Sequence, residues 1–148
     1  MNLNFKPINK DEILSILPLL YKANTTTPHD ILKERVLEMA TYNNYECVGV
    51  FDNDKLIGIS GLWYSVRHYS GRSVEPDHVI IDNTYRGKNI GKQFFNWIYE
   101  YTKSKGYEAV ELNTYTGNTK SHKFYYNERF EIYGFHFVKV IRDDQKFY

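Results

Sequence analysis

A loop rich in glycine and basic residues lies between an apolar run ending at Ile81 and an amphipathic run around Phe94. The second run is predicted to be a helix, and a helix start presents unpaired backbone N–H groups and the positive end of the helix dipole. Glycines allow that backbone to approach a ligand closely, and the loop carries Arg86, Lys88 and Lys92. The combination predicts binding of a phosphate-bearing molecule.

The loop does not match either of the two common phosphate-binding patterns. A P-loop requires G-x-x-x-x-G-K-[ST], but Gln93 stands where Ser or Thr should contact the metal. A dinucleotide-binding fingerprint requires G-x-G-x-x-G, which Gly87 and Gly91 do not form. Taken alone, the loop is equally consistent with an ordinary helix start.

The elements that position this loop follow from periodicity and turn residues. Strands are predicted over residues 2–8, 45–51, 55–65, 73–81 and 107–114, with a final strand or pair of strands over 130–141. Helices are predicted over residues 13–21, 29–42, 90–105 and 119–127, and Pro18 is expected to kink or shorten the first of them. Residues 52–54 are predicted to form a hairpin turn and residues 66–72 a loop, while Gly58 and Gly61 could mark a bulge. The strand–helix–strand unit over 73–114 is expected to form two nearby parallel strands joined by a right-handed crossover.

Two segments together resemble the GCN5-related N-acetyltransferase (GNAT) family. The family's pyrophosphate loop, [Q/R]-x-x-G-x-[G/A], corresponds to Arg86–Gly91, with Asn89 in place of the middle glycine. Asn is the non-glycine residue that best tolerates positive φ, so the loop shape is expected to persist. The second family pattern is roughly N-x-x-[A/S]-x-x-F-Y-x-x-x-G-F. It is matched, except that Arg129 replaces the glycine, by Asn118, Ser121, Phe124, Tyr125 and Phe130.

The resemblance covers most of the chain from Tyr45 onward and implies a GNAT-like α/β (α+β) fold. The expected architecture is a mixed, mostly antiparallel central sheet of six to seven strands with helices on both faces, in one domain over residues 1–148. The resemblance also implies a coenzyme A site. The pyrophosphate would be held by Arg86, Gly87, Lys88, Asn89, Ile90, Gly91 and Lys92. The pantetheine arm would pair with the strand edge at Val79, Ile80 and Ile81, and be contacted by Asn118, Ser121, Phe124 and Tyr125.

Some of these residues also have purely structural interpretations. Ile80 and Ile81 are equally expected in the core, and Asn118 is an equally good helix cap. Cys47 lies in an apolar strand and is interpreted as a buried, unreactive thiol. As the only cysteine, it excludes an internal disulfide and any multi-cysteine metal site. No metal is expected, because the direct attack implied by the resemblance needs none.

The reaction implied is transfer of an acetyl group from acetyl-CoA to a primary amine by direct attack. An alkyl ammonium has a pKa of about 10.4, so at neutral pH a base, or a water leading to one, is useful. The leaving thiolate has a conjugate-acid pKa of about 8.5, and a phenol can protonate it. Tyr125 matches the family's tyrosine and is the candidate acid, although a half-buried aromatic side chain is the alternative interpretation.

Asp77 and Glu75 are the candidate bases. They precede the loop on one strand and should share a face, from which either could draw a proton through water. Solvated acids at a strand end are the alternative interpretation, and His78 is expected to point to the opposite face. By position, residues 22–29 and 63–69 could border the acceptor pocket.

Composition limits the other functional classes. The 148 residues carry a net charge of +1 and 17% aromatic side chains, which argues against disorder and against a nucleic-acid or membrane partner. The first residues lack the apolar core of a signal peptide, so a cytoplasmic protein is expected. A small-molecule or peptide amine acceptor is expected, and a homodimer is consistent with the family. A catalytically inactive acyl-CoA-binding regulatory module and a nucleic-acid-binding domain remain as rival hypotheses.

Overall fold

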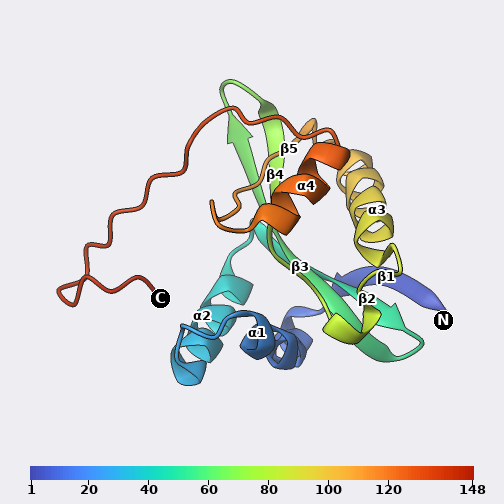
Figure 1. Ribbon diagram of the computed structural model, residues 1–148, viewed down its shortest axis with the longest axis horizontal. Helices are drawn as coiled ribbons and strands as arrows, with labels where there is room; N and C mark the ends of the chain where they lie inside the picture. The colour runs from blue at the N-terminus through green and yellow to red at the C-terminus, as the bar shows by residue number, and fades with distance from the viewer. The chain divides into compact units, whose positions relative to one another are not determined.

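A mixed five-stranded sheet with the order β1-β2-β3-β4-β5 organises residues 1–112 (Figure 1). Its strands are β1 (Leu3–Ile8), β2 (Tyr45–Asp52), β3 (Lys55–Arg67), β4 (Gly71–Ile81) and β5 (Ala109–Val110). Neighbouring strands are antiparallel except for β4 and β5, which are parallel. The predicted mixed, mostly antiparallel sheet is therefore confirmed, but the expected six to seven strands were too many.

This computed structural model describes all 148 residues, which form two units. The first unit runs from Met1 to Leu112 and contains the sheet, and the second runs from Asn113 to Tyr148. The expectation of a single domain stays a prediction.

Helices cover both faces of the sheet in the first unit, as predicted (Figure 1). The 3-10 helix η1 (Lys10–Ile16), α1 (Leu17–Ala23) and α2 (His29–Thr41) bury Ile16, Leu20 and Val36 against one face. On the other face, α3 (Ile90–Ser104) buries Phe94 and Ile98 among the aliphatic side chains of β2, β3 and β4. Removal of this apolar surface from water on both faces holds the layers together.

Pro18 begins a helix rather than kinking one. The chain is 3-10 helical to Ile16, and α1 then starts with Pro18 in its first turn. Because first-turn N–H groups have no partner within a helix, proline is tolerated there.

The two hairpins differ in how well the sequence predicted them. The turn at Asn53 joins β2 to β3 as expected, and Asn53 adopts a positive φ of 53°. The expected loop over 66–72 is instead a tight connection, because β3 continues to Arg67 and β4 begins at Gly71. Gly71 has a φ of +73°, which favours glycine and allows this sharp return.

The second unit contains one helix, α4 (Thr119–Asn127), as predicted. The strand expected over 107–114 is reduced to Ala109–Val110, and no strand is formed over 130–141. A strand needs hydrogen-bonded neighbours, and the backbone of residues 131–141 forms no such pairing. Alternating apolar residues alone therefore did not determine the structure of this segment.

Candidate functional site

The loop before α3 leaves the helix start open. Gly87 has a φ of +78°, and Asn89 takes the N-cap position in the left-handed region with a φ of 60°. The Asn89 side chain does not cap the helix, and the first helical hydrogen bond runs from the Gln93 N–H to the Asn89 carbonyl at 3.2 Å. First-turn N–H groups without helical acceptors are therefore provided by Ile90, Gly91 and Lys92.

Electrostatics also favour an anion at this loop. Arg86, Lys88 and Lys92 are exposed, and nothing lies within 4 Å of the space beside Gly87. Hydrogen bonds from the Thr84 N–H and hydroxyl, helped by Lys22 at 3.3 Å, lower the pKa of Asp82 to about 2. The Asp82 carboxylate is thus already paired with Thr84 and Lys22, while the three basic side chains face solvent.

The edge of β4 that leads to this loop lacks a strand partner along much of its length. β5 pairs only with Ser73 and Val74, and the Glu111 N–H adds one bond to the Val74 carbonyl at 2.9 Å. β4 continues to Ile81, so its last residues have a neighbour only on the β3 side. Ile80 and Ile81 also pack against the two core clusters, so their structural interpretation is confirmed.

A bulge interrupts the pairing of β3 with β4 immediately before this edge. Ile59 pairs with Ile80 and Gly61 with Asp77, which leaves two residues of β4 opposite Ser60. His78 lies in the bulge with a φ of 37°, a conformation that non-glycine residues rarely adopt.

The bulge reverses the expected direction of His78. A Cβ added to Gly61 would lie 2.4 Å from His78 Cε1, so the imidazole covers Gly61 on the same face that carries Asp77. The expectation that His78 points to the opposite face was wrong, because strand alternation fails where a residue is inserted. Gly61 in β3 was the residue in the sequence that signalled this bulge.

Asp77 is the centre of a hydrogen-bonded group on this face. Its carboxylate lies 3.4 Å from His78 Nδ1 and accepts from Trp63 Nε1 at 3.4 Å. It also accepts from the His78 N–H at 2.8 Å, and His78 Nε2 lies 3.4 Å from the Tyr45 hydroxyl. Because a carboxylate only accepts, Nδ1 carries the imidazole proton, and in the neutral ring Nε2 then accepts from Tyr45.

These contacts set the ionisation of Asp77. Partial burial acts to raise its pKa, but the hydrogen bonds and positive charge from His78, with the Trp63 bond, bring the pKa below its usual value. The side chain is still 52% exposed, so a ligand can reach it. Glu75 pairs with Trp63 across the β3–β4 ladder and shares the face, as predicted.

The other predicted site residues belong to the second unit. The Asn118 side chain accepts from the Ser121 N–H at 3.3 Å, so it caps α4, as its structural interpretation requires. Tyr125 packs edge-on against Phe124 and Phe130, each with ring centroids 5.6 Å away, and burial raises the pKa of its phenol. The Tyr125 hydroxyl thus stays protonated well above neutral pH.

Both departures from the family patterns occupy left-handed backbone. Asn89 adopts a positive φ of 60°, the conformation that its residue type was expected to tolerate. Arg129, which follows the end of α4, has a φ of 65° and so takes the conformation that glycine usually provides.

Comparison with known proteins is decisive for the family. A sequence model of the acetyltransferase (GNAT) family matches residues 13–130. The chain belongs to the GNAT family. No curated protein sequence gives a significant match. Similar solved structures include a possible acetyltransferase from Clostridium difficile 630, with 18% identity and a TM-score of 0.80, covering 96% of this chain and 100% of that one.

Two further structures resemble this GNAT chain at similar identity. AAC(6')-Iy in complex with the bisubstrate analogue CoA-S-monomethyl-acetylneamine has 16% identity and a TM-score of 0.80, covering 96% of this chain and 99% of that one. Glucosamine-6-phosphate N-acetyltransferase from Arabidopsis thaliana has 15% identity and a TM-score of 0.70, covering 96% and 100%. At these identities, the likeness supports the fold.

Three further features of the GNAT chain concern its cysteine, its potential metal ligands and its helices. Burial raises the pKa of the Cys47 thiol to about 12, so its interpretation as an unreactive buried side chain is confirmed. No group of three or more His, Cys, Asp or Glu side chains is placed to hold a metal ion. None of the helices is both long enough and apolar enough to span a membrane.

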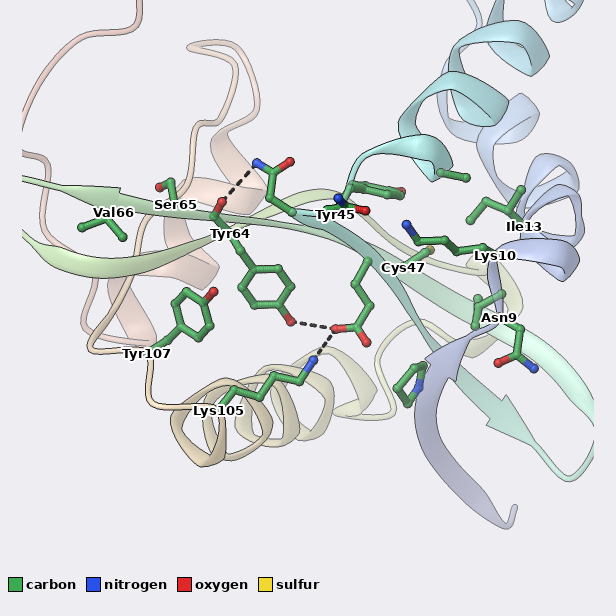
Figure 2. Close-up of a pocket in the computed structure, with 16 residues that line it drawn as sticks. Asn9, Lys10, Ile13, Tyr45, Cys47, Tyr64, Ser65, Val66, Lys105 and Tyr107 are labelled. Atoms are coloured by element: carbon green, nitrogen blue, oxygen red, sulfur yellow. Dashed lines mark hydrogen bonds and ion pairs between the residues drawn. The ribbon is translucent and has the colours of Figure 1, made fainter.

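A groove of about 770 Å³ lies where β1 ends beside β2, away from the loop (Figure 2). Glu46 on its wall accepts from the hydroxyls of Tyr64 and Tyr101, both at 2.7 Å, and from Lys105 Nζ at 2.9 Å. Burial acts to raise the pKa of Glu46, but these bonds outweigh it and bring the pKa below its usual value. Glu46 is therefore ionised, and its hydrogen bonds connect the C-terminal end of α3 to the sheet.

We expect Glu46→Gln to destabilise the protein by roughly 1–3 kcal/mol at neutral pH, since hydrogen bonds to a charged acceptor are lost. Because the folded pKa is lowered, this stability is fully present above the unfolded value of about 4.3 and is lost as pH falls through the folded pKa. Denaturant unfolding of both proteins across this range measures it. Glu100→Gln, on the exposed side of α3, is the matched control. A difference that stays constant down to the most acidic pH would contradict the assignment.

Proposed function

We propose that this GNAT protein transfers an acetyl group from acetyl-CoA to a primary amine of a small molecule or peptide by direct attack. The observation that carries the proposal is the open, uncapped start of α3 behind left-handed Asn89. Membership of the family supports it. AAC(6')-Iy structures with CoA and with a CoA bisubstrate analogue also support a CoA-type cosubstrate for this fold.

The residues present fit the diphosphate of such a cosubstrate. Backbone N–H groups from Gly87 to Gly91, together with Lys92, would donate to its oxygens, and Arg86 and Lys88 would supply positive charge. Lys88 Nζ lies 5.0 Å from the centroid of the Tyr85 ring and would turn from it toward the phosphates.

The amide-rich pantetheine arm would pair with the free edge of β4. Val79, Ile80 and Ile81 offer backbone groups there without a strand on that side, so the arm would add to the sheet as an extended peptide does. Asn118, Ser121 and Phe124 are assigned to the same ligand through the family pattern. Asn118 would use its N–H₂ group, since its oxygen caps α4.

Asp77 is the stronger of the two candidate bases. It is ionised, half exposed and held in one position by His78 and Trp63. A carboxylate with a lowered pKa is a poor final site for the proton, so Asp77 would hold the ammonium and pass its proton to solvent through a water. Glu75 would then contribute negative charge on the same face.

Completion of the reaction requires protonation of the leaving thiolate. As the amine nitrogen bonds to the thioester carbonyl carbon, the C–S bond breaks, and Tyr125 would donate its phenolic proton to sulfur. Burial keeps this phenol protonated beforehand. No protein nucleophile is needed, and the buried Cys47 is unsuited to be one.

The proposal is tested by incubating the purified protein with acetyl-CoA and a panel of amines and measuring release of free thiol. Turnover that requires an amine supports the acetyltransferase. Tight coenzyme binding without turnover on a broad panel favours the alternative, an inactive acyl-CoA-binding regulatory module. Absence of coenzyme binding would exclude both.

We expect Asp77→Asn to lower turnover about tenfold to a hundredfold with little change in coenzyme affinity, because amide and carboxylate are similar in shape but only the carboxylate holds a cation and accepts its proton. Initial rates at saturating acetyl-CoA measure this effect. Glu75→Gln is the matched variant on the same face. A larger loss in Glu75→Gln than in Asp77→Asn would transfer the base assignment to Glu75.

A further inference from the structure

His78 adopts a backbone conformation that its surroundings must stabilise. Its φ of 37° is rare for a residue with a side chain, and such backbone persists only where neighbouring contacts over-determine it. The imidazole is only 13% exposed, and its Nε2 lies 3.4 Å from the hydroxyl of buried Tyr45. Strained residues of this kind concentrate at functional sites, which directs attention to what His78 contacts.

Gly61 provides the space that the imidazole fills. A Cβ at this position would lie 2.9 Å from His78 Nε2, 2.9 Å from Tyr45 Cε2 and closer still to His78 Cε1. Gly61 is not among the glycines with a positive φ. The room for the His78 ring, rather than backbone freedom, is therefore what requires glycine here.

Ser60 holds the backbone of the same bulge. The pairing of β3 with β4 is irregular between Ile59 and Gly61, and the buried Ser60 hydroxyl lies between them. This hydroxyl is 3.3 Å from the Asp77 carbonyl oxygen and 2.9 Å from that of Gly61. A side-chain donor thus reaches the Asp77 carbonyl at the point where the bulge disrupts the ladder.

The two carboxylate oxygens of Asp77 have different surroundings. Oδ2 lies 3.4 Å from both His78 Nδ1 and Trp63 Nε1, whereas Oδ1 accepts only from the His78 N–H, at 2.8 Å. Each oxygen of a carboxylate can accept about two hydrogen bonds. Oδ2 is therefore occupied by protein donors, while Oδ1 keeps one position for a ligand on a side chain that is 52% exposed.

We propose that His78, packed over Gly61, is the positioning residue of Asp77: together with Trp63 it occupies Oδ2 and so directs the acceptor ammonium to Oδ1. This role rests on the proposed function, in which Asp77 holds that ammonium and passes on its proton. An ammonium that can bind only one carboxylate oxygen approaches from one direction, which orients the nitrogen lone pair after deprotonation. His78 thus acts on the amine, through Asp77, and not on the coenzyme.

The first test compares two variants that both tolerate a positive φ, His78→Asn and His78→Gly. Asparagine places an N–H₂ donor near the position of Nδ1, whereas glycine leaves Oδ2 without that contact. His78→Gly is expected to lower kcat/KM for the amine about tenfold to a hundredfold at saturating acetyl-CoA, and His78→Asn to recover most of the loss. Coenzyme affinity, measured by titration, is expected to stay the same. Full turnover by His78→Gly, or equal losses in the two variants, would overturn the role of His78.

Gly61→Ala tests the space for the imidazole from the opposite strand. The added Cβ displaces the ring, so a similar loss in kcat/KM for the amine is expected while coenzyme affinity is kept. Gly49→Ala in β2 is the matched control, because its Cβ would lie 2.8 Å from Phe51 Cε2 and 2.9 Å from Leu56 Cδ1, away from Asp77 and His78. Equal amine kinetics in the two alanine variants would contradict the requirement for space at Gly61.

A third readout needs no turnover. Nitrogen-15 NMR of the His78 side chain, at about pH 9 where a free imidazole is neutral, reports which ring nitrogen carries the proton. Nδ1 is expected in the wild type, and Asp77→Ala is expected to shift the proton toward Nε2. A proton on Nε2 in the wild type would overturn the role of His78 and leave the proposed function intact. A wild type that turns over no amine would instead overturn the proposed function, and the role of His78 in orienting the acceptor with it.

Discussion

Gly91→Glu is expected to abolish measurable coenzyme A binding, with a loss of at least a hundredfold in affinity. The substitution places a carboxylate in the first turn of α3, among the N–H groups proposed to hold the diphosphate. Two like charges about 4 Å apart near a protein surface repel by about 4 kcal/mol, and every 1.4 kcal/mol is a factor of ten in affinity. Isothermal titration with coenzyme A measures the effect.

This variant separates binding from folding unusually well. Glutamate is a better helix former than glycine, and a carboxylate in the first turn is favoured by the helix dipole, so α3 should be no less stable. Asn96→Glu adds the same charge on the exposed side of α3 beyond its first turn and should bind coenzyme almost normally. Coenzyme binding by Gly91→Glu equal to that of Asn96→Glu would show that the diphosphate binds elsewhere.

The loop could be predicted because its determinants are local. A strand end, glycine and asparagine at the required turns, and an amphipathic helix fix the backbone within about ten residues. The sequence therefore identified both the open helix start and the left-handed Asn89. Likewise, the helices on both faces followed from periodic apolar residues, which respond directly to burial.

Gly61 marked a possible bulge, and a bulge is present there, but the direction of His78 could not be predicted because it depends on pairing between two strands. Nothing within residues 73–81 shows that Ser60 will face two residues of β4. Once that happens, His78 turns onto the face of Asp77, and the isolated carboxylate becomes a hydrogen-bonded group with Trp63 and Tyr45. Asp77 could be identified as a candidate base from its residue type and position in the sequence. Its hydrogen bonds with His78 and Trp63 could be identified only from the folded structure.

The segment 131–141 illustrates a different limit of sequence patterns. Its alternating apolar residues indicate a preference for extended backbone. A strand, however, exists only when another strand offers hydrogen bonds. The pattern does not state which chain supplies that edge.

Tyr125→Phe is expected to lower turnover about a hundredfold or more while coenzyme affinity changes little. Only the phenolic oxygen and its proton are removed, and the ring keeps its edge-on packing against Phe124 and Phe130. General acid catalysis typically contributes a factor of 10² to 10⁴, and a thiolate with a conjugate-acid pKa of about 8.5 gains from a proton donor. Steady-state rates with acetyl-CoA across a range of pH, together with coenzyme binding by titration, measure the two effects separately.

The adjacent residue provides the matched control for the acid. Tyr126 lies on the same helix but is 57% exposed, so Tyr126→Phe removes an identical hydroxyl from a solvated position and should leave turnover unchanged. Burial raises the pKa of the Tyr125 phenol. The difference in turnover between Tyr125→Phe and the wild type should therefore persist at alkaline pH rather than disappear near pH 10, the ordinary pKa of a tyrosine. Tyr125→Phe turning over like the wild type at every pH would show that another group, or water, protonates the leaving sulfur.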